Sequence, residues 1–502
     1  MGPQMKRYLA PAAIIAIGLL TAQVILTLFV YQSNISLLKS LKAIARAGYL
    51  VVPNAQVMAA LDAFLPAFCG GLFFTLTAGA GLALGGFILI YLWRVVFAGH
   101  PLLLFIIVIF WELGIYKAAQ TDAPLLLTAA FILIPLLVLA LMGKWLKKSL
   151  AVSDGKLVLI HLAAVLLIGG IWLPNMNTDV FVNIRDQLLL GNPAGQQINS
   201  FYYRYTLYPA EAFKALSQRQ LKTARIQINE PRLFAQVEKS LRRADYLALA
   251  SDIPMDLTVR SASGELIFGH KAQKVQEVSI SRFLSAPKDV LKSFSKKTDQ
   301  MQFLRAFTFF SLIIPSPLLL YFFIHTLISG LLFRIRHPVK RSALAAAACV
   351  ILAAAGAYAL YPFQSDLRIE TAQAGIGAML KSGDRDLRVA ALKRIDDQDL
   401  PIAAYESTVL KLSKSPATAE RYWTAKVLDN SDSAGTYQML LHLLDDPHPN
   451  VVCMALYSLG NRDADQAVGE IKHVLKISDH WYVQWYAYNA LKELGWIQPE
   501  SV

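Results

Sequence analysis

Seven long apolar runs restrict what this sequence can fold into. A helix needs about 20 consecutive apolar residues to cross the roughly 30 Å hydrocarbon core of a bilayer. Runs close to or above this length occupy residues 9–31, 65–93, 95–116, 124–143, 157–173, 303–333 and 342–362. Charged residues make up only 17% of the chain, against about 25% in typical soluble proteins. The sequence therefore predicts a mostly α-helical, polytopic membrane bundle with about seven spans.

The distribution of Lys and Arg between the short loops predicts the orientation of the spans, because cytoplasmic loops carry an excess of both. If the N-terminus is cytoplasmic, 11 of these residues lie inside and 4 outside. The inside residues are Lys6, Arg7, Arg94, Lys144, Lys147, Lys148, Lys156, Arg334, Arg336, Lys340 and Arg341. The outside residues are Lys39, Lys42, Arg46 and Lys117. We therefore predict a multi-pass protein of the bacterial inner membrane, with segments 174–302 and 363–502 in the periplasm and the first run retained as a span.

The segment 174–302 is predicted to form a small α+β domain outside the membrane. ARIQIN alternates like a strand, NEPRLFAQVEKSLRRA has helical periodicity, and Ser263-Gly264 marks the turn of a hairpin. The segment carries 18 Lys/Arg against 12 Asp/Glu, whereas residues 363–502 carry 14 against 19. The acidic tail is therefore a candidate to dock on the basic domain.

Tyrosine is dense in the stretch FYYRYTLY, residues 201–208. Three interpretations stay open. The stretch forms a packed core under a long loop, which we favour slightly. Alternatively it forms an aromatic surface at the membrane interface, or it binds a ligand or partner.

Three ionisable residues lie within the apolar runs, namely Glu112, His161 and His325. Ionisable groups are costly in lipid, which makes each a candidate functional residue. A hydrogen bond to a neighbouring helix is the simpler interpretation of the histidines. Both fall in the inner half of the predicted bundle, where a b-type haem is conceivable, but we predict no cofactor.

Gly81 and Gly85 form a GxxxG pattern in the second run. Small residues at this spacing let two helix backbones approach closely in lipid. We expect ordinary packing within the bundle, with a self-association face or a substrate path as the alternatives.

No pattern of residues that specifies catalysis is present in the sequence. It lacks a nucleophile elbow, a Gly-rich phosphate loop and HExxH, and Cys69, Cys349 and Cys453 have no metal-ligand spacing. We therefore predict no catalytic residues and no metal site, and favour a protein that is not an enzyme. The net charge of +13 comes largely from loops between apolar runs, so we expect no nucleic-acid partner.

A repeated pattern occupies the tail. The segments DRDLRVAALKRI, ATAERYWTAKVL, HPNVVCMALYSLG and WYVQWYAYNALKELG align through Ala391, Ala425, Ala455 and Ala487, at intervals of 34, 30 and 32 residues. Such periods are typical of stacked helix pairs. With the D-P-x-P-x-V turn at 446–451 and A-L-x-x-L-G at 455–460, the tail resembles HEAT-like repeats of the short type also found in bilin lyases. The resemblance implies an α-solenoid that binds other proteins; the apolar runs resemble no family.

The last repeat contains aromatic residues on one helix face, Trp481, Trp485 and Tyr488. They are interpreted either as the cap of the repeat core or as an exposed anchor for a partner protein, since Trp and Tyr are enriched in interface hot spots.

These features predict four regions. Residues 1–173 form a membrane domain with five spans, 174–302 the α+β domain, 303–362 two further spans, and 363–502 the HEAT-like domain. The predicted function is a non-enzymatic membrane scaffold, or assembly protein, whose periplasmic repeat arm binds or organises partner proteins. The alternatives are a transporter or permease subunit, and a membrane enzyme acting on a lipid-linked substrate with Glu112 or an outer-surface acid as its base.

Overall fold

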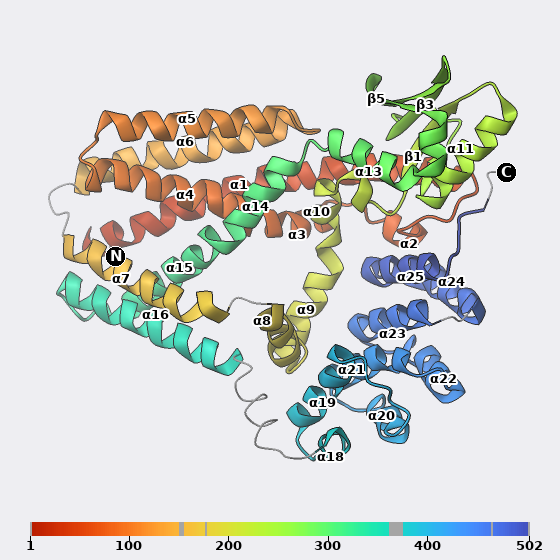
Figure 1. Ribbon diagram of the computed structural model, residues 1–502. Coiled ribbons are helices and arrows are strands. Elements are labelled where there is room, and N and C mark those ends of the chain that lie inside the picture. The colour runs from red at the N-terminus through yellow and green to blue at the C-terminus, as the bar shows by residue number, and fades with distance from the viewer. Residues whose placement is uncertain (1–2, 150–154, 176–177, 361–374, 463–464, 500–502) are drawn as a thin grey trace.

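Helices make up most of the chain in the computed structural model, which describes residues 3–149, 155–175, 178–360, 375–462 and 465–499 (Figure 1). Within these residues, seven helical segments are long and apolar enough to cross a membrane, as the sequence predicts. The segments are α1 (Pro3–Arg46), α3 (Phe64–Phe74) with η1 (Thr75–Gly79), α4 (Ala80–Tyr91) and η2 (Leu92–Val96), α5 (Pro101–Ala119), α6 (Pro124–Ser149), α7 (Gly155–Trp172), α14 (Gln302–Ile313) with α15 (Pro315–Leu331), and α16 (Pro338–Leu360).

The first helix extends well beyond the length of one span. Its 44 residues correspond to about 66 Å at 1.5 Å per residue, roughly twice the thickness of a hydrocarbon core. Leu38, Leu41 and Ile44 in its second half are buried. The second half of α1 is therefore packed inside the molecule, and α10 is one of the elements that α1 contacts.

Polar side chains satisfy the irregular turns of the second span. In the π-helical segment η1, the hydroxyl of Thr75 donates to Oε1 of Gln23 on α1 at 2.7 Å. Nε2 of Gln23 donates in turn to the carbonyl of Phe68 at 2.9 Å. The hydroxyl of Ser316, next to the α14–α15 break, donates to the carbonyl of Leu76 at 2.6 Å. Hydrogen bonds between helices thus satisfy polar groups at and near these irregular backbone segments.

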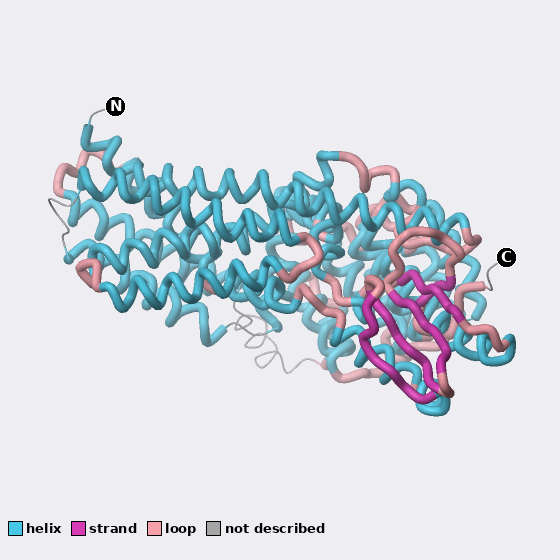
Figure 2. Tube along the Cα trace, turned by 90° about the horizontal axis from the view of Figure 1, so that it is seen from above, coloured by secondary structure: helices cyan, strands magenta, loops and turns pink. Residues whose placement is uncertain are grey.

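A five-stranded sheet with three helices lies at the end of the molecule opposite the N-terminus (Figure 2). The strand order is β2-β1-β3-β4-β5, with β1 parallel to β2 and β3, and the remaining pairs antiparallel. Ser263 and Gly264 both have positive φ at the β3–β4 turn, as a type I′ hairpin requires. The elements are β1 (Lys222–Gln227), α11 (Pro231–Arg243), β2 (Tyr246–Ala248), β3 (Leu257–Ala262), β4 (Glu265–His270), β5 (Gln273–Ser279), α12 (Ile280–Ser285) and α13 (Pro287–Lys297).

The segment before the sheet packs differently from the sheet itself. It contains α8 (Thr178–Asn183), η4 (Ile184–Leu189), α9 (Pro193–Tyr205) and α10 (Leu207–Phe213). Its buried apolar residues belong to one hydrophobic core shared with the candidate spans and the tail, whereas most of those in the sheet and α11–α13 form a separate core. We call α8, η4 and α9 the shelf, because they lie between the bundle and the tail (Figure 1).

Four helix pairs follow one another in residues 375–462 and 465–499, the described part of the tail. Their first helices are α18 (Ile376–Leu380), α20 (Glu406–Leu412), α22 (Ala434–Leu443) and α24 (Val468–Ile477). Their second helices are α19 (Arg385–Asp397), α21 (Thr418–Val427), α23 (Pro449–Asn461) and α25 (Trp481–Glu493). We call this arrangement the repeat stack.

The helix starts correct the predicted alignment of the second repeat. The residues that precede the second helices are Asp384, Ala417, His448 and His480, at intervals of 33, 31 and 32. Counted from these positions, Thr424 rather than Ala425 corresponds to Ala391, Ala455 and Ala487. All four side chains at this position are fully buried. The shift arose because both Thr424 and Ala425 are small, and only the helix start distinguishes them.

Candidate interaction site of the repeat stack

The second helices of the repeat stack face the shelf, and their contacts begin at a shared carboxylate. Asp186 of η4 is 5% exposed and lies 2.8 Å from both Nε of Arg185 and Nζ of Lys393. It also accepts a hydrogen bond from Nε1 of Trp423 at 2.9 Å. Arg185 in turn donates to the hydroxyl of Tyr422 at 2.7 Å and lies over its ring. Residues of α19 and α21 are thus tied to one turn of the shelf.

Further along the shelf the contacts become neutral. Nδ2 of Asn199 donates to Oδ1 of Asn450 at 2.7 Å, and both side chains are buried. The rings of Tyr203 and Tyr482 lie 4.7 Å apart, and Thr206 donates to the hydroxyl of Tyr482 at 3.2 Å. Burial raises the pKa of Tyr482 to about 12, so its hydroxyl stays protonated at neutral pH. The shelf therefore covers the same face of successive repeats.

The three aromatic residues of the last repeat lie against other parts of this chain. Trp481 packs edge-on against Tyr208 of α10, with ring centroids 5.1 Å apart. The carbonyl of Trp485 accepts from Nε2 of Gln220 at 3.0 Å. Tyr488 is 1% exposed, and its hydroxyl donates to Oδ1 of Asp245 at 2.6 Å. That these side chains anchor a partner protein stays a prediction; in the structure this face holds the tail to the middle of the chain.

Segment 174–302 has a net positive charge and the tail a net negative charge. In most ion pairs between them, however, the tail supplies the cation and the segment supplies the anion. Lys393 and Lys492 of the tail pair with Asp186 and Asp245 at 2.8 and 3.0 Å. One pair has the expected signs, with Nη2 of Arg204 3.7 Å from Oδ2 of Asp479. The tail lies on the middle segment as the charge split suggests, but specific buried pairs rather than overall charge hold it there.

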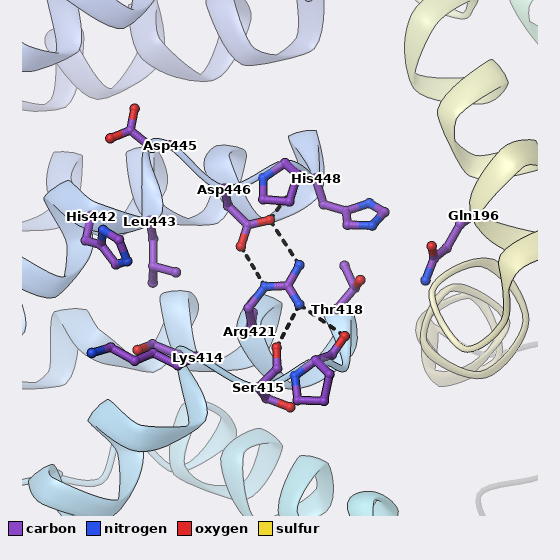
Figure 3. Close-up of a pocket in the computed structure, with 13 residues that line it drawn as sticks. Gln196, Lys414, Ser415, Thr418, Arg421, His442, Leu443, Asp445, Asp446 and His448 are labelled. Atoms are coloured by element: carbon purple, nitrogen blue, oxygen red, sulfur yellow. Dashed lines mark hydrogen bonds and ion pairs between the residues drawn. The ribbon is translucent and has the colours of Figure 1, made fainter.

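A cleft of about 580 Å³ opens on the loop edge of the stack, with Gln196 of the shelf on one side (Figure 3). Arg421 forms its floor with a two-bond pair to Asp446, at 2.6 and 3.1 Å, and donates to the carbonyl of Ser415 at 2.8 Å. Its remaining lining includes exposed Lys414, His442 and Asp445, with His448 pointing toward Gln196 of the shelf. The cleft has a rigid floor and a polar, accessible rim.

Residues 405–492 match the family of HEAT repeats. The resemblance predicted from the sequence is confirmed over this range, which spans the second, third and fourth helix pairs. From here on we call the whole repeat stack the HEAT stack; its first pair, α18 and α19, lies outside the matched range. No curated protein and no solved structure matches the chain. HEAT repeats indicate a protein-interaction or scaffold role, which agrees in kind with the accessible cleft.

Sequence reasoning missed the polar contacts that join the HEAT stack to the loop after α1. Asn54, in the loop after α1, donates through Nδ2 to three carbonyls at the end of α24, at 2.9–3.0 Å. Its backbone N–H donates to Oε1 of Gln484 at 2.7 Å. Gln498 forms two hydrogen bonds with the backbone of Leu50, at 3.0 and 2.8 Å. Of these roles, the local sequence could have predicted only that Asn54 is the N-cap of α2 (Ala55–Met58), because Asn is a preferred N-cap residue.

The two histidines of the apolar runs, His161 and His325, lie together between α7, α15 and α16. Their ring centroids are 4.6 Å apart. Nδ1 of His161 lies 2.8 Å from the hydroxyl of Tyr321, and Nε2 of His325 lies 3.2 Å from the hydroxyl of Ser342. Rings in direct contact leave no gap for a macrocycle between them, so the pair does not fit a haem held by both.

The other candidate residues of the apolar runs are dispersed. The side chain of Glu112, on α5, is exposed. A Cβ on Gly81 would meet Oγ of Ser311 at 2.2 Å, so α4 and α14 touch closely there, whereas nothing lies within 4 Å of a Cβ on Gly85. Among the described residues, no group of three or more His, Cys, Asp or Glu could hold a metal ion.

Proposed function

We propose that this protein is a multi-pass membrane scaffold whose HEAT stack binds or organises partner proteins. The observation that carries the proposal is the division of the stack into two surfaces. One surface is closed by the shelf, Asn54 and the sheet domain, and the other presents the cleft around Lys414 and His442. A repeat stack fixed to a membrane bundle in this way would hold a partner at a set distance and angle from the bilayer.

In this proposal residues 1–173 and 303–362 insert in the inner membrane, and 174–302 and 363–502 lie in the periplasm. Two findings support it. The shelf and the HEAT stack contact each other directly, so they lie at the same side of the bundle. The excess of Lys and Arg lies in loops at the opposite end.

Cysteine labelling tests the orientation. Cys69, Cys349 and Cys453 are buried, so background labelling should be low. We expect a membrane-impermeant maleimide to label His442→Cys in intact spheroplasts, and to label Lys340→Cys only after lysis. The reverse pattern would contradict the proposed orientation.

Site-specific crosslinking tests the partner site. A photo-crosslinking amino acid placed at Lys414 or His442 of the full-length protein should give a discrete adduct with another protein in cells. The same group at Lys274, an exposed residue of β5, is the matched control. Adducts at neither cleft position, or the same adducts at all three positions, would argue against a binding site in the cleft.

A further inference from the structure

A second, more enclosed pocket lies where the bundle, the shelf and the HEAT stack meet. Its volume is about 240 Å³. Its walls come from α2, the start of α3, the corner between α9 and α10, and the start of α25, which Figure 1 shows converging. Pro66, Arg204, Tyr205, Tyr208, His480 and Trp481 are among its lining residues. We call it the seam pocket.

The mouth of the seam pocket carries two opposite charges that are only loosely paired. Arg204 and Asp479 are 64% and 75% exposed, and their closest atoms are 3.7 Å apart. This separation exceeds a hydrogen bond, and exposed pairs of this kind contribute little to stability. Both groups can therefore turn to a ligand at small cost, and together they match a molecule that carries one anionic and one cationic group.

The interior of the pocket is aromatic, and one of its lining residues, His480, has an unsatisfied polar atom. Tyr205, Tyr208 and Trp481 line it, with 6.5 Å between the first two rings and 5.1 Å between the last two. Aromatic faces attract ammonium groups. Nδ1 of His480 is buried and has no hydrogen-bond partner among the described residues. A ligand group that bonds to this nitrogen would remove an unsatisfied site.

The surroundings of the pocket are apolar. Pro66 lies between Leu65 and Phe68, which with Phe64 are exposed at the start of the second candidate span. On the shelf, Phe201 and Tyr202 are also exposed. Their ring centroids lie 6.0 and 5.9 Å from that of Phe73 on α3. In the proposed membrane orientation these side chains lie at the outer interface, where aromatic residues are enriched. Acyl chains would meet this apolar belt while a headgroup enters the pocket.

We propose that the seam pocket binds the headgroup of a zwitterionic phospholipid. The phosphodiester is held by Arg204 and His480, and the ammonium group by Asp479 and the aromatic walls. The inference rests on the proposed membrane location. A bound lipid would contact the bundle, the shelf and the last HEAT repeat at once, and so would join the stack to the bilayer in which the spans lie.

Lipid titration of the delipidated, full-length protein in detergent tests this site. Native mass spectrometry with short-chain phosphatidylethanolamine should show saturable binding of one lipid. We expect Arg204→Gln and Asp479→Asn each to weaken it about tenfold, the effect of losing one charged contact. Both residues are exposed, so their variants should keep the parent's melting temperature. Lys414→Gln in the other cleft should bind like the parent.

Competing ligands distinguish a zwitterionic lipid headgroup from an anionic headgroup and from free phosphate. Phosphatidylglycerol, which lacks the ammonium group, should bind more weakly than phosphatidylethanolamine, and inorganic phosphate should not compete at millimolar concentration. Equal binding by the parent and both variants would overturn the proposal. Equal binding of the two lipids, or displacement by phosphate, would also overturn it. If cysteine labelling supports the membrane orientation while lipid binding fails, only the seam pocket proposal falls.

Discussion

The two surfaces of the HEAT stack differ in how their polar groups are used. On the shelf side, Asp186 and Asn450 are buried and their hydrogen bonds run to other parts of the chain. On the loop side, Lys414 and His442 are exposed around a cleft whose floor, Arg421, bonds to Asp446 and Ser415 of the stack itself. The first arrangement is costly to open, because each separated group would be left without a partner. The second can gain and lose a partner without disturbing the repeats.

Removing the shared carboxylate should have the largest effect on the shelf side. Asp186→Ala leaves Arg185 and Lys393 without their common partner in a mostly buried position. Breaking a buried ion pair by removing one member costs about 3–5 kcal/mol. We expect lower thermal stability in detergent and loss of hydrogen-exchange protection in α21. Glu277→Gln, in an exposed pair on β5, is the control and should change neither. Unchanged protection in Asp186→Ala would show that the charged cluster does not hold the stack.

Opening the link at the other end of the stack should have a smaller effect. Asn54→Ala removes the N-cap of α2 and the donor to three carbonyls of α24. We expect the free energy of unfolding to fall by about 2–3 kcal/mol. The effect is smaller than that of Asp186→Ala because water can hydrate some of the carbonyls that Asn54 leaves without a partner. Gln56→Ala, an exposed neighbour on α2, is the matched control. Chemical denaturation compares the two variants, and equal midpoints would contradict a tethering role for Asn54.

A single hydroxyl tests the aromatic face of the last repeat. Tyr488→Phe removes the hydrogen bond to Asp245 and keeps the ring in place. A hydrogen bond to a charged group contributes about 1.5–3 kcal/mol, and we expect the lower end because Lys492 still pairs with Asp245. Tyr457→Phe, at an exposed position of α23, should leave stability unchanged. If Tyr488→Phe instead abolishes crosslinking at the cleft and leaves stability intact, Tyr488 serves a partner and not the docking.

Features with a local pattern could be predicted from the sequence, and features that depend on distant contacts could not. The candidate spans and the HEAT period follow from runs of apolar residues and from helical spacing, which neighbouring residues determine. The role of Asn54 depends on carbonyls more than 420 residues away, and no pattern around it marks them. The same is true of Gln484 and Gln498. Asp186 likewise has no local pattern that marks its partners on α19 and α21.

The aromatic side chains show the limit of the same reasoning within one repeat. Trp481, Trp485 and Tyr488 stand at helical spacing on α25. Spacing does not say what covers a helix face, and here it is the chain's own α10, the segment before β1, and Asp245. A tail considered by itself would therefore expose aromatic side chains that other parts of the whole chain cover.

The pH dependence of docking gives the finest distinction between the two surfaces. Burial lowers the pKa of His480 from 6.5 to about 4, with Asp479 opposing and Arg204 reinforcing the shift. Between these values the unfolded chain binds a proton at His480 that the folded chain does not, so stability falls as the pH decreases from 6.5 toward 4. In delipidated protein, His480→Gln should flatten the dependence of melting temperature on pH in this range. His442→Gln, on the exposed rim of the cleft, should leave it unchanged. If His442→Gln flattened the curve and His480→Gln did not, the loss of stability at low pH would arise at the cleft of the HEAT stack and not at the seam pocket.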